Sequence, residues 1–415
     1  MFHYQCAAME MVRGKLALVV AVGLGWAWMA QGQIDPFKRE LIQLGYNQPI
    51  QGRGPLAGYA FYYLNLPQFI ETNLTLRLAV APVYLDTELG ISRVFGPNTD
   101  VGFGVHGGGF ADSYAEIREG DFRQSESFTG HGAGVSASLY HLFNPGRMIP
   151  LSGVFRVESH YSIYSRDDDT ADNFEVPDDR GSWNFRTGLR WGGSEPTMNP
   201  EFSLELSAWY EAQVRMDSGR YGFNGDREVE PISHLYWARA LMSYTLTNWQ
   251  HHFAVSLTLG GSAAADRFST YRLGGILPLA AEFPLSLPGY YFQEISAKRF
   301  VLLGANYLLP LDRRNQWALS FIAAGAATDY LDGLEQPGSW QSGVGAGIRW
   351  RPSKSWQVSV GYAYGIDAIR NGDRGAHSIG FLMQWDVEAA GHGLFEPGEN
   401  PIRSRGLGRL FRFGE

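Results

Sequence analysis

A glutamate, a histidine and a serine on one short segment are residue types found in hydrolase sites. Glu158, His160 and Ser162 occupy alternate positions, so their side chains project from one face if the chain is extended. In serine hydrolases a carboxylate orients an imidazole, which in turn activates a hydroxyl. Alternate polar residues are common in any strand, and we therefore interpret these three as part of a strand surface, with catalysis as the alternative.

The residues that could bind metal ions lack the spacing of dedicated sites. Ten histidines are present, but the adjacent His251 and His252 would point to opposite faces of a strand and could not bind one ion together. An acidic cluster could offer carboxylate oxygens to calcium, yet it lacks the regular spacing of a calcium loop, and a solvated loop is the better interpretation. Its members are Asp167, Asp168, Asp169, Asp172, Asp178 and Asp179. We therefore expect no catalytic, cofactor-binding or metal-binding residues, and a protein that is not an enzyme.

The overall composition departs from that of a soluble enzyme. Of the 415 residues, 18% are charged, 14% are aromatic and 51 are glycine. Soluble domains average about 25% charged residues. The formal net charge of −8 also argues against a nucleic-acid partner.

The N-terminus has the organisation of a secretory signal peptide. Two basic residues, Arg13 and Lys15, precede an apolar run at residues 16–27 that ends in small residues. We predict that residues 1–32 are removed on export, with an uncleaved membrane anchor as the alternative. The only cysteine, Cys6, lies in this segment, so the mature protein would have no thiol. No later stretch of about 20 apolar residues occurs, so no transmembrane helix is predicted beyond it.

The remainder of the chain consists of strand-length segments of alternating character. Near the C-terminal end, Val358, Val360 and Tyr362 fall on one face of an extended chain, and Ser359 and Gly361 fall on the other. We count about 15 such segments by this criterion. Further examples are residues 74–80, 133–139, 202–209, 253–259, 343–350 and 378–385.

These segments favour an all-β fold, a transmembrane antiparallel β-barrel of about 16 strands. A soluble sandwich or propeller, the alternative, would expose Lys and Glu on its second face, whereas here that face carries Gly, Ser, Ala and Gln. Bacterial barrels normally have an even number of strands, so we place a sixteenth strand before Asp217. Aromatic residues near strand ends match the girdles that lie at lipid headgroups, among them Trp183, Trp191, Trp209, Trp350, Trp356 and Trp385.

The same pattern predicts how the chain is divided. Short turns should face the periplasm, and long polar loops should face outward. The aromatic residues Phe411 and Phe413 leave open whether Trp385 ends the last strand. The predicted segments are a signal peptide (1–32), a short periplasmic segment (33–53), an outer-membrane barrel (54–387) and a tail (388–415).

The last third of the chain contains an ordered series of short motifs. Phe268 leads to Tyr-Arg-Leu-Gly-Gly, an apolar stretch reaches Leu-Ser-Leu-Pro-Gly-Tyr-Tyr, and a strand at residues 299–311 follows with four more strand candidates. In order and spacing, residues 268–385 resemble the BamA-like superfamily of barrels, the bacterial surface antigens. In that family a long loop between the first two motifs folds back into the barrel lumen. The residues that carry the resemblance are Leu273, Gly274, Gly275, Leu287, Pro288, Gly289, Tyr290, Tyr291, Asn306 and Tyr307.

The chain departs from the family at two of these motifs. Pro288 replaces the family's loop arginine, which packs against acidic residues of the lumen wall. Asn306 and Leu308 replace the Glu and Arg of the returning strand. The resemblance implies that residues 285–291 lie inside the barrel, and the lost arginine implies that packing holds them there.

The composition of this loop agrees with an inward position. Its many apolar residues would be an aggregation liability if they were exposed. We expect Gly289 to let the backbone approach the wall closely. We expect Tyr290 and Tyr291 to bond to polar groups of the lumen such as Asn306.

The resemblance implies a role in outer-membrane biogenesis or protein translocation. Family members with these roles carry periplasmic modules before the barrel, and we expect a member without such modules because residues 33–53 are too few to form one. A diffusion pore or substrate-specific pore is the alternative, and a barrel lipase or protease is a further one. Expected partners are outer-membrane lipid, lipopolysaccharide and, for insertion, the barrel assembly machinery. The cargo or solute is not identifiable from the sequence.

Overall fold

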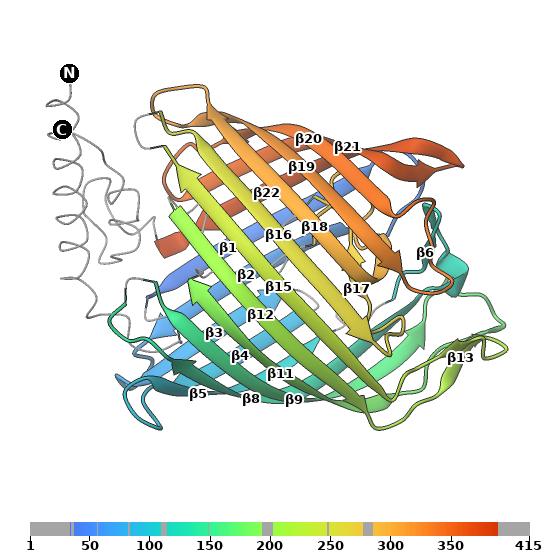
Figure 1. Ribbon diagram of the computed structural model, residues 1–415, viewed down its shortest axis with the longest axis horizontal. Helices are drawn as coiled ribbons and strands as arrows, with labels where there is room; N and C mark the ends of the chain where they lie inside the picture. The colour runs from blue at the N-terminus through green and yellow to red at the C-terminus, as the bar shows by residue number, and fades with distance from the viewer. Residues whose placement is uncertain are drawn as a thin grey trace, which may run out of the picture.

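The protein is a closed antiparallel barrel (Figure 1). The structure, a computed structural model, describes residues 34, 37–55, 57–81, 84–108, 114–147, 149–192, 202–246, 249–276 and 285–388. The predicted signal peptide and almost all of the predicted tail lie outside these residues. The barrel strands are β1 (Arg39–Pro49), β2 (Ala57–Pro67), β3 (Leu74–Ala81), β4 (Tyr84–Ile91), β5 (Thr99–Gly108), β8 (Phe128–Leu142), β9 (Leu151–Arg166), β11 (Arg180–Gly192), β12 (Phe202–Arg215), β15 (Ile232–Thr245), β16 (His252–Ala263), β18 (Ile295–Pro310), β19 (Trp317–Tyr330), β20 (Trp340–Trp350), β21 (Trp356–Arg370) and β22 (Asp373–Asp386).

The pairing of the first and last strands closes the barrel. β22 pairs with β1 from Leu41 opposite Asp386 to Pro49 opposite Ser378. The sheet has 17 strands, of which β17 (Tyr271–Leu273) is a short inner strand beside β18, so 16 strands form the wall. The predicted fold class and strand number are therefore confirmed.

The first strand corrects the predicted boundary of the barrel. Residues 33–53 were expected to precede the barrel, but Arg39–Pro49 forms β1, which pairs with β2 on one side and β22 on the other. Within it Leu44 and Tyr46 face outward, while Gln43 and Asn47 are buried. This polar inner side made the segment resemble a linker, although its alternation of residues is that of a strand.

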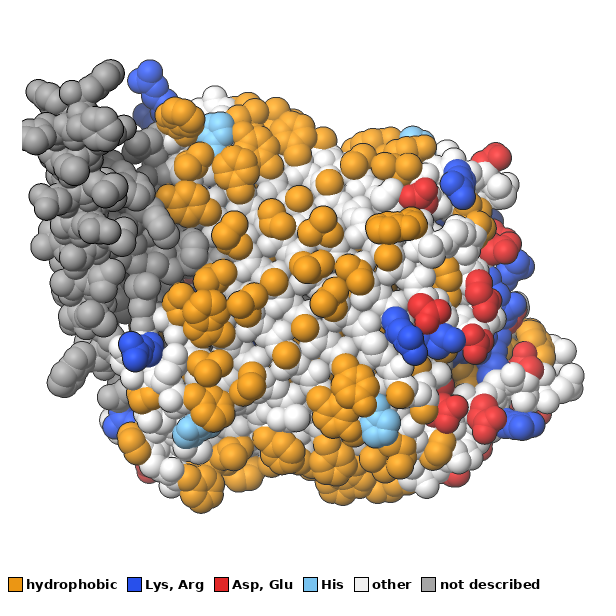
Figure 2. Space-filling model, in the orientation of Figure 1, with side chains coloured by type: hydrophobic (Ala, Val, Ile, Leu, Met, Phe, Trp, Pro, Cys, Tyr) orange, Lys and Arg blue, Asp and Glu red, His pale blue; other side chains and the backbone are white. Residues whose placement is uncertain are grey.

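The apolar face of the strands points out of the barrel. Val360 and Tyr362 of β21 are 50% and 44% exposed, whereas Gln357 and Ala363 on the opposite face are buried. Figure 2 shows hydrophobic side chains spread over the outer wall and most of the visible charged side chains at one end. An outer wall of this kind is solvated by lipid hydrocarbon in transmembrane barrels. Within the part of the chain described here, no helix has the length and apolar character needed to cross a membrane.

The two ends of the barrel differ in the length of their connections. The start of β1, the end of β22 and short turns such as residues 311–316 and 351–355 lie at one end, the short-turn end. Stacked tryptophan pairs lie there, with ring centroids 5.6 Å apart in Trp317–Trp350 and 5.1 Å in Trp356–Trp385. The long connections lie at the other end, the long-loop end, and contain the short strands β6 (Ile117–Arg118), β7 (Asp121–Phe122), β10 (Phe174–Glu175), β13 (Arg220–Phe223) and β14 (Arg227–Glu228).

Candidate functional site

A segment that follows β17 packs against the inner face of the wall. The backbone N–H of Leu287 donates to the carbonyl of Gly275 at 2.9 Å, and that of Gly274 donates to Leu285 at 3.0 Å, so the chain turns back on itself. We call residues 285–294 the lumen loop. Its apolar side chains join those of β17 and the wall in one buried cluster, which contains Leu273, Leu287, Tyr290, Ile295, Ala297, Phe300, Leu302, Ala326, Ala368 and Ala376.

The tip of the lumen loop touches the backbone of two wall strands. Gly289 has a φ of +85°, and a Cβ at this position would overlap the backbone nitrogen of Gly365 on β21. A Cβ on Gly343 of β20 would likewise overlap the carbonyl oxygen of Pro288. Only glycine allows an approach this close, as expected for Gly289.

The tyrosine of the tip makes a hydrogen-bonded chain with the wall. The Tyr290 hydroxyl donates to Gln341 Oε1 at 2.8 Å, and Gln341 Nε2 donates to the Tyr330 hydroxyl at 2.7 Å. All three residues lie away from Asn306, which is on β18 opposite Ala254 and Ile322. The expected bond from the loop tyrosines to Asn306 is therefore replaced by the bond to Gln341.

An ion pair holds the base of the lumen loop. Glu294 accepts two hydrogen bonds from Arg370 of β21, at 2.8 and 2.7 Å, and the two side chains are 1% and 2% exposed. The backbone N–H of Tyr291 also donates to Glu294, at 2.7 Å, and the Arg370 guanidinium lies 3.5 Å from the centre of the Tyr291 ring. The Tyr291 hydroxyl donates to the carbonyl of Gln51, in the β1–β2 connection, at 3.2 Å.

This ion pair corrects the expectation that packing alone holds the loop. The family's charge anchor is an arginine on the loop, whereas here the loop carries the acid, Glu294, and the wall carries the arginine, Arg370. Both residues lie outside the motifs that suggested the resemblance, so the motifs gave no signal for them. The returning-strand residue Tyr307 is not part of the loop contacts either, because it faces outward and its hydroxyl lies 2.6 Å from His251 Nδ1.

The lumen wall from β3 to β15 is lined by paired charges. Arg156 lies 3.0 Å from Glu158, and Arg190 lies 3.1 Å from Glu205. A further pair, Arg186–Glu211, has a separation of 2.7 Å. The wall beneath the lumen loop is different, because there Gln341, Gly343 and Gly365 face inward. The lumen loop thus covers positions of β20 and β21 and leaves the ion pairs of β9, β11 and β12 on the other side of the lumen.

The candidate histidines of the sequence lie in different parts of the barrel, His160 on β9 and the pair His251–His252 at the start of β16. His160 Nδ1 is 3.2 Å from His106 Nε2, and the two rings are stacked with centroids 5.2 Å apart. Ser162 is buried two residues further along β9. His252 is buried in the wall and His251 contacts outward-facing Tyr307, so the two do point to opposite faces. Among the residues that the structure describes, no group of three or more His, Cys, Asp or Glu could hold a metal ion.

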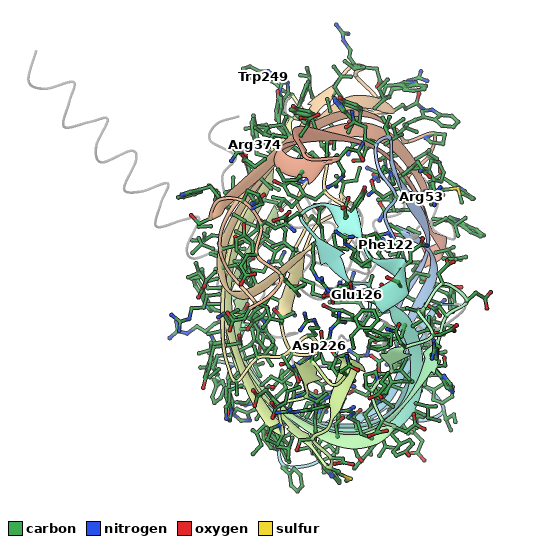
Figure 3. All side chains as sticks on the ribbon, turned by 90° about the vertical axis from the view of Figure 1, so that its right-hand side faces the viewer. Arg53, Phe122, Glu126, Asp226, Trp249 and Arg374 are labelled. Atoms are coloured by element: carbon green, nitrogen blue, oxygen red, sulfur yellow. The ribbon has the colours of Figure 1, made fainter. Side chains whose placement is uncertain are left out.

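Loops at the long-loop end fold inward over the barrel (Figure 3). Figure 3 looks onto this end, and Phe122, Glu126 and Asp226 lie inside the outline of the barrel. In the acidic cluster of the β9–β11 connection, Asp167 accepts from the Thr129 hydroxyl at 2.9 Å and Asp172 lies 3.6 Å from Arg166. These contacts are those of a polar loop anchored to strand ends.

Comparison with known proteins gives matches in structure alone. No family model matches the chain, and no curated protein sequence does. CdiB from Acinetobacter baumannii matches with a TM-score of 0.52 and 11% identity over 84% of this chain and 60% of that one. CdiB from Escherichia coli matches with a TM-score of 0.54 and 13% identity over 84% of this chain and 63% of that one. BamA from Haemophilus ducreyi lacking POTRA domains 1–3 matches with a TM-score of 0.52 and 11% identity over 83% of this chain and 70% of that one.

These matches concern the barrel. The chain spans less than two thirds of the length of either CdiB chain, and sequence identities of 11 to 13% carry information about the fold and no more. The common architecture agrees with the resemblance of residues 268–385 to the BamA-like superfamily. The chain has the fold of the BamA and CdiB barrels.

Proposed function

We propose that this protein is an integral outer-membrane barrel that passes polypeptides across or into that membrane. The observation that carries the proposal is the lumen loop, which is packed on the inner wall and clamped by Glu294 and Arg370. A barrel fold shared with BamA and CdiB supports it. The apolar outer wall would contact lipid, and the barrel assembly machinery would insert the chain.

The connections indicate the orientation in the membrane. Outer-membrane barrels place short turns in the periplasm and long loops outside. The short-turn end would thus be periplasmic, and the long-loop end would contact lipopolysaccharide. Residues 1–32 would be removed on export, before the barrel assembles.

The lumen loop would define the path of the cargo. It covers inner-wall positions of β20 and β21, among them Gly343 and Gly365, and leaves the side lined by Arg156, Arg186 and Arg190 with their acidic partners. Paired charges of both signs solvate polar backbone and side chains without strong preference for either charge. An unfolded polypeptide has that mixed character.

The test is a comparison of the proteins in the outer membrane and medium of the host bacterium with and without the gene. The proposal is supported if a defined set of proteins is lost in the deletion strain, if the wild-type chain restores that set, and if the Glu294→Gln chain restores less of it. Glu175→Gln, at an exposed glutamate of β10, is the matched control and should restore the set fully. Unchanged protein levels in the deletion strain would refute the proposal.

The charged side of the lumen also favours a second function, a pore for hydrophilic solutes. Such a pore would pass small ions and sugars along the same row of ion pairs. Unchanged protein levels together with slower uptake of a small hydrophilic solute would support this second function.

A further inference from the structure

The loops at the long-loop end form a compact cap. We define the cap as residues 114–127, 167–179, 217–231 and 264–272, which come from four separate connections. An aromatic cluster packs these loops against the first residue of β8 and against β9. It contains Tyr114, Phe128, Phe174, Tyr221 and Val229, with Tyr164, Phe223 and Phe268 at its edge.

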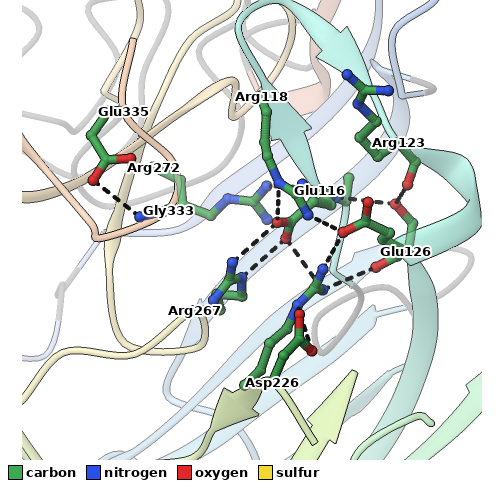
Figure 4. Close-up of polar contacts among 12 residues, drawn as sticks. Glu116, Arg118, Arg123, Glu126, Asp226, Arg267, Arg272, Gly333 and Glu335 are labelled. Carbon is green, nitrogen blue, oxygen red and sulfur yellow. Dashed lines mark hydrogen bonds and ion pairs between the residues drawn. The ribbon is translucent and has the colours of Figure 1, made fainter. Parts of the chain in front are cut away.

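A single buried carboxylate joins three of these connections. Glu116 is 0% exposed, and Arg118 on its own loop donates to it from Nε at 3.0 Å. Arg267, before β17, donates from Nε at 3.1 Å and from Nη2 at 3.2 Å. Arg227, in the β12–β15 connection, has its Nη1 3.5 Å from the carboxylate. Figure 4 shows Arg118 and Arg267 pointing toward Glu116.

A second carboxylate extends this network. Glu126 contacts both Arg118 and Arg227, so the two acids share two of their arginines. Arg272 adds a hydrogen bond of 2.6 Å to the carbonyl of Ala115 and lies 4.8 Å from the centre of the Tyr114 ring. The charged network thus continues from the β5–β8 connection to the β17 side of the barrel.

The cap reaches the opposite wall as well. The tip of the β6–β7 hairpin lies on β21, where a Cβ on Gly120 would overlap the carbonyl oxygen of Ile369. Arg370, next to Ile369, is the residue that clamps the lumen loop. The hairpin therefore crosses the mouth and ends beside the base of the lumen loop.

We propose that the cap is a gate over the external mouth of the barrel, held shut by Glu116. The ion pairs at Glu116 are made between loops, while other cap residues also contact wall strands, such as Asp266, which lies 3.0 Å from Arg215 of β12. Breaking the Glu116 ion pairs would therefore release these loops from one another without breaking the hydrogen bonds of the 16 wall strands. Removing one partner of a buried ion pair is strongly destabilising, so the closed arrangement depends on Glu116, with Glu126 sharing two of its arginines. The gate would control ions and water as well as any cargo, so it goes beyond the proposed function and takes from it only the orientation in the membrane.

The ionisation of Glu116 agrees with this clamp. Burial alone would raise the pKa of Glu116, but Arg227 and Arg267 beside it, followed by Arg118, hold the pKa below its ordinary value. The carboxylate is consequently charged while the cap is closed. The charged and titratable groups around it, from every loop that packs on it, are Tyr114, Arg118, Glu126, Tyr221, Arg227, Arg267 and Arg272.

The test is the conductance of the purified full-length chain in planar lipid bilayers. We expect Glu116→Gln to raise the open-channel current or open time at least several-fold, because Gln removes the negative charge on which three arginines converge. Glu119→Gln is the matched control, with the same charge change on an exposed glutamate three residues away. Retention of the barrel is checked by the heat-dependent shift of the folded band on a gel.

Arg267→Gln provides an independent variant, since it removes one partner from a different loop. A folded Glu116→Gln or Arg267→Gln chain with the conductance of the wild type would overturn the proposal. A further measurement leaves the network intact and uses Ser136→Cys, at a buried inner-wall position of β8. A membrane-impermeant thiol reagent added from the external side should label it slowly in an otherwise wild-type chain. Rapid labelling would show that the cap does not close the mouth, and would equally overturn the proposal.

Discussion

Replacing Arg370 by methionine should release the lumen loop from the wall. The change leaves the Glu294 carboxylate buried without its bidentate partner, since both side chains are at most 2% exposed. It also removes the cation that lies 3.5 Å from the Tyr291 ring. Breaking a buried ion pair by removing one partner costs about 3–5 kcal/mol. At about 1.4 kcal/mol for each factor of ten, the population with a displaced loop should rise by roughly two to three and a half orders of magnitude.

The position of the loop can be followed with a cysteine at Ser286. Gly289 is unsuitable for such a label, because any Cβ there would overlap the backbone of Gly365. With Ser286→Cys as the common background, we expect a polar thiol reagent to label the Arg370→Met chain far faster than the parent. Arg374→Met is the matched control, because the Arg374 side chain is 63% exposed and lies 3.9 Å from Asp367. Such an exposed pair contributes about 0–1 kcal/mol.

A double variant separates the unpaired charge from other effects of the substitution. Arg370→Met combined with Glu294→Leu leaves no buried charge, and apolar replacements of buried pairs are often neutral or stabilising. We expect labelling of Ser286→Cys in this double variant to return most of the way to the parent rate. Equal labelling of the Arg370→Met and Arg374→Met chains would refute the reasoning, because it would mean that the ion pair does not hold the loop.

Three other predictions follow from the structure. Val360→Arg places a charge on the outer wall and should lower the free energy of unfolding in lipid by about 2–4 kcal/mol if the residue lies near the bilayer centre. Ser359→Arg, on the inner face, should lower it by less. Equal losses of the two variants in urea titrations would contradict the outward assignment of Val360. Gly289→Ala should destabilise the loop through overlap with Gly365, and an unchanged Ser286→Cys labelling rate in that variant would count against the close approach. Glu116 has a lower pKa in the closed cap than in the open one, where it should be about 4.3. Its ionised form therefore stabilises the closed cap above the open-state pKa, and this stabilisation is lost as the pH falls through the closed-state pKa. Bilayer current should therefore rise in acid for the wild type, and an equal rise in the Glu116→Gln chain, which lacks this carboxyl, would argue against the clamp.

The sequence determined the class of fold through strict alternation of residue character. Alternate side chains of a strand point to opposite faces, so apolar residues such as Val360 and Tyr362 had to share one surface. The other surface carried small and polar residues, which indicated a wall with lipid outside and a polar lumen inside. The same rule applied to Arg39–Pro49, where the polar inner residues Gln43 and Asn47 concealed the first strand.

The resemblance to the BamA-like superfamily also predicted that residues 285–291 turn inward, in agreement with apolar side chains that would be unfavourable in water. It did not predict what holds them. Glu294 and Arg370 are 76 residues apart, and Glu116 and Arg267 are 151 residues apart. Local patterns determine which face a residue takes, but only the closure and register of the barrel decide which residues meet across the lumen. The two ion clamps are therefore products of the tertiary structure, since a buried charge is stable only where the fold delivers its partner.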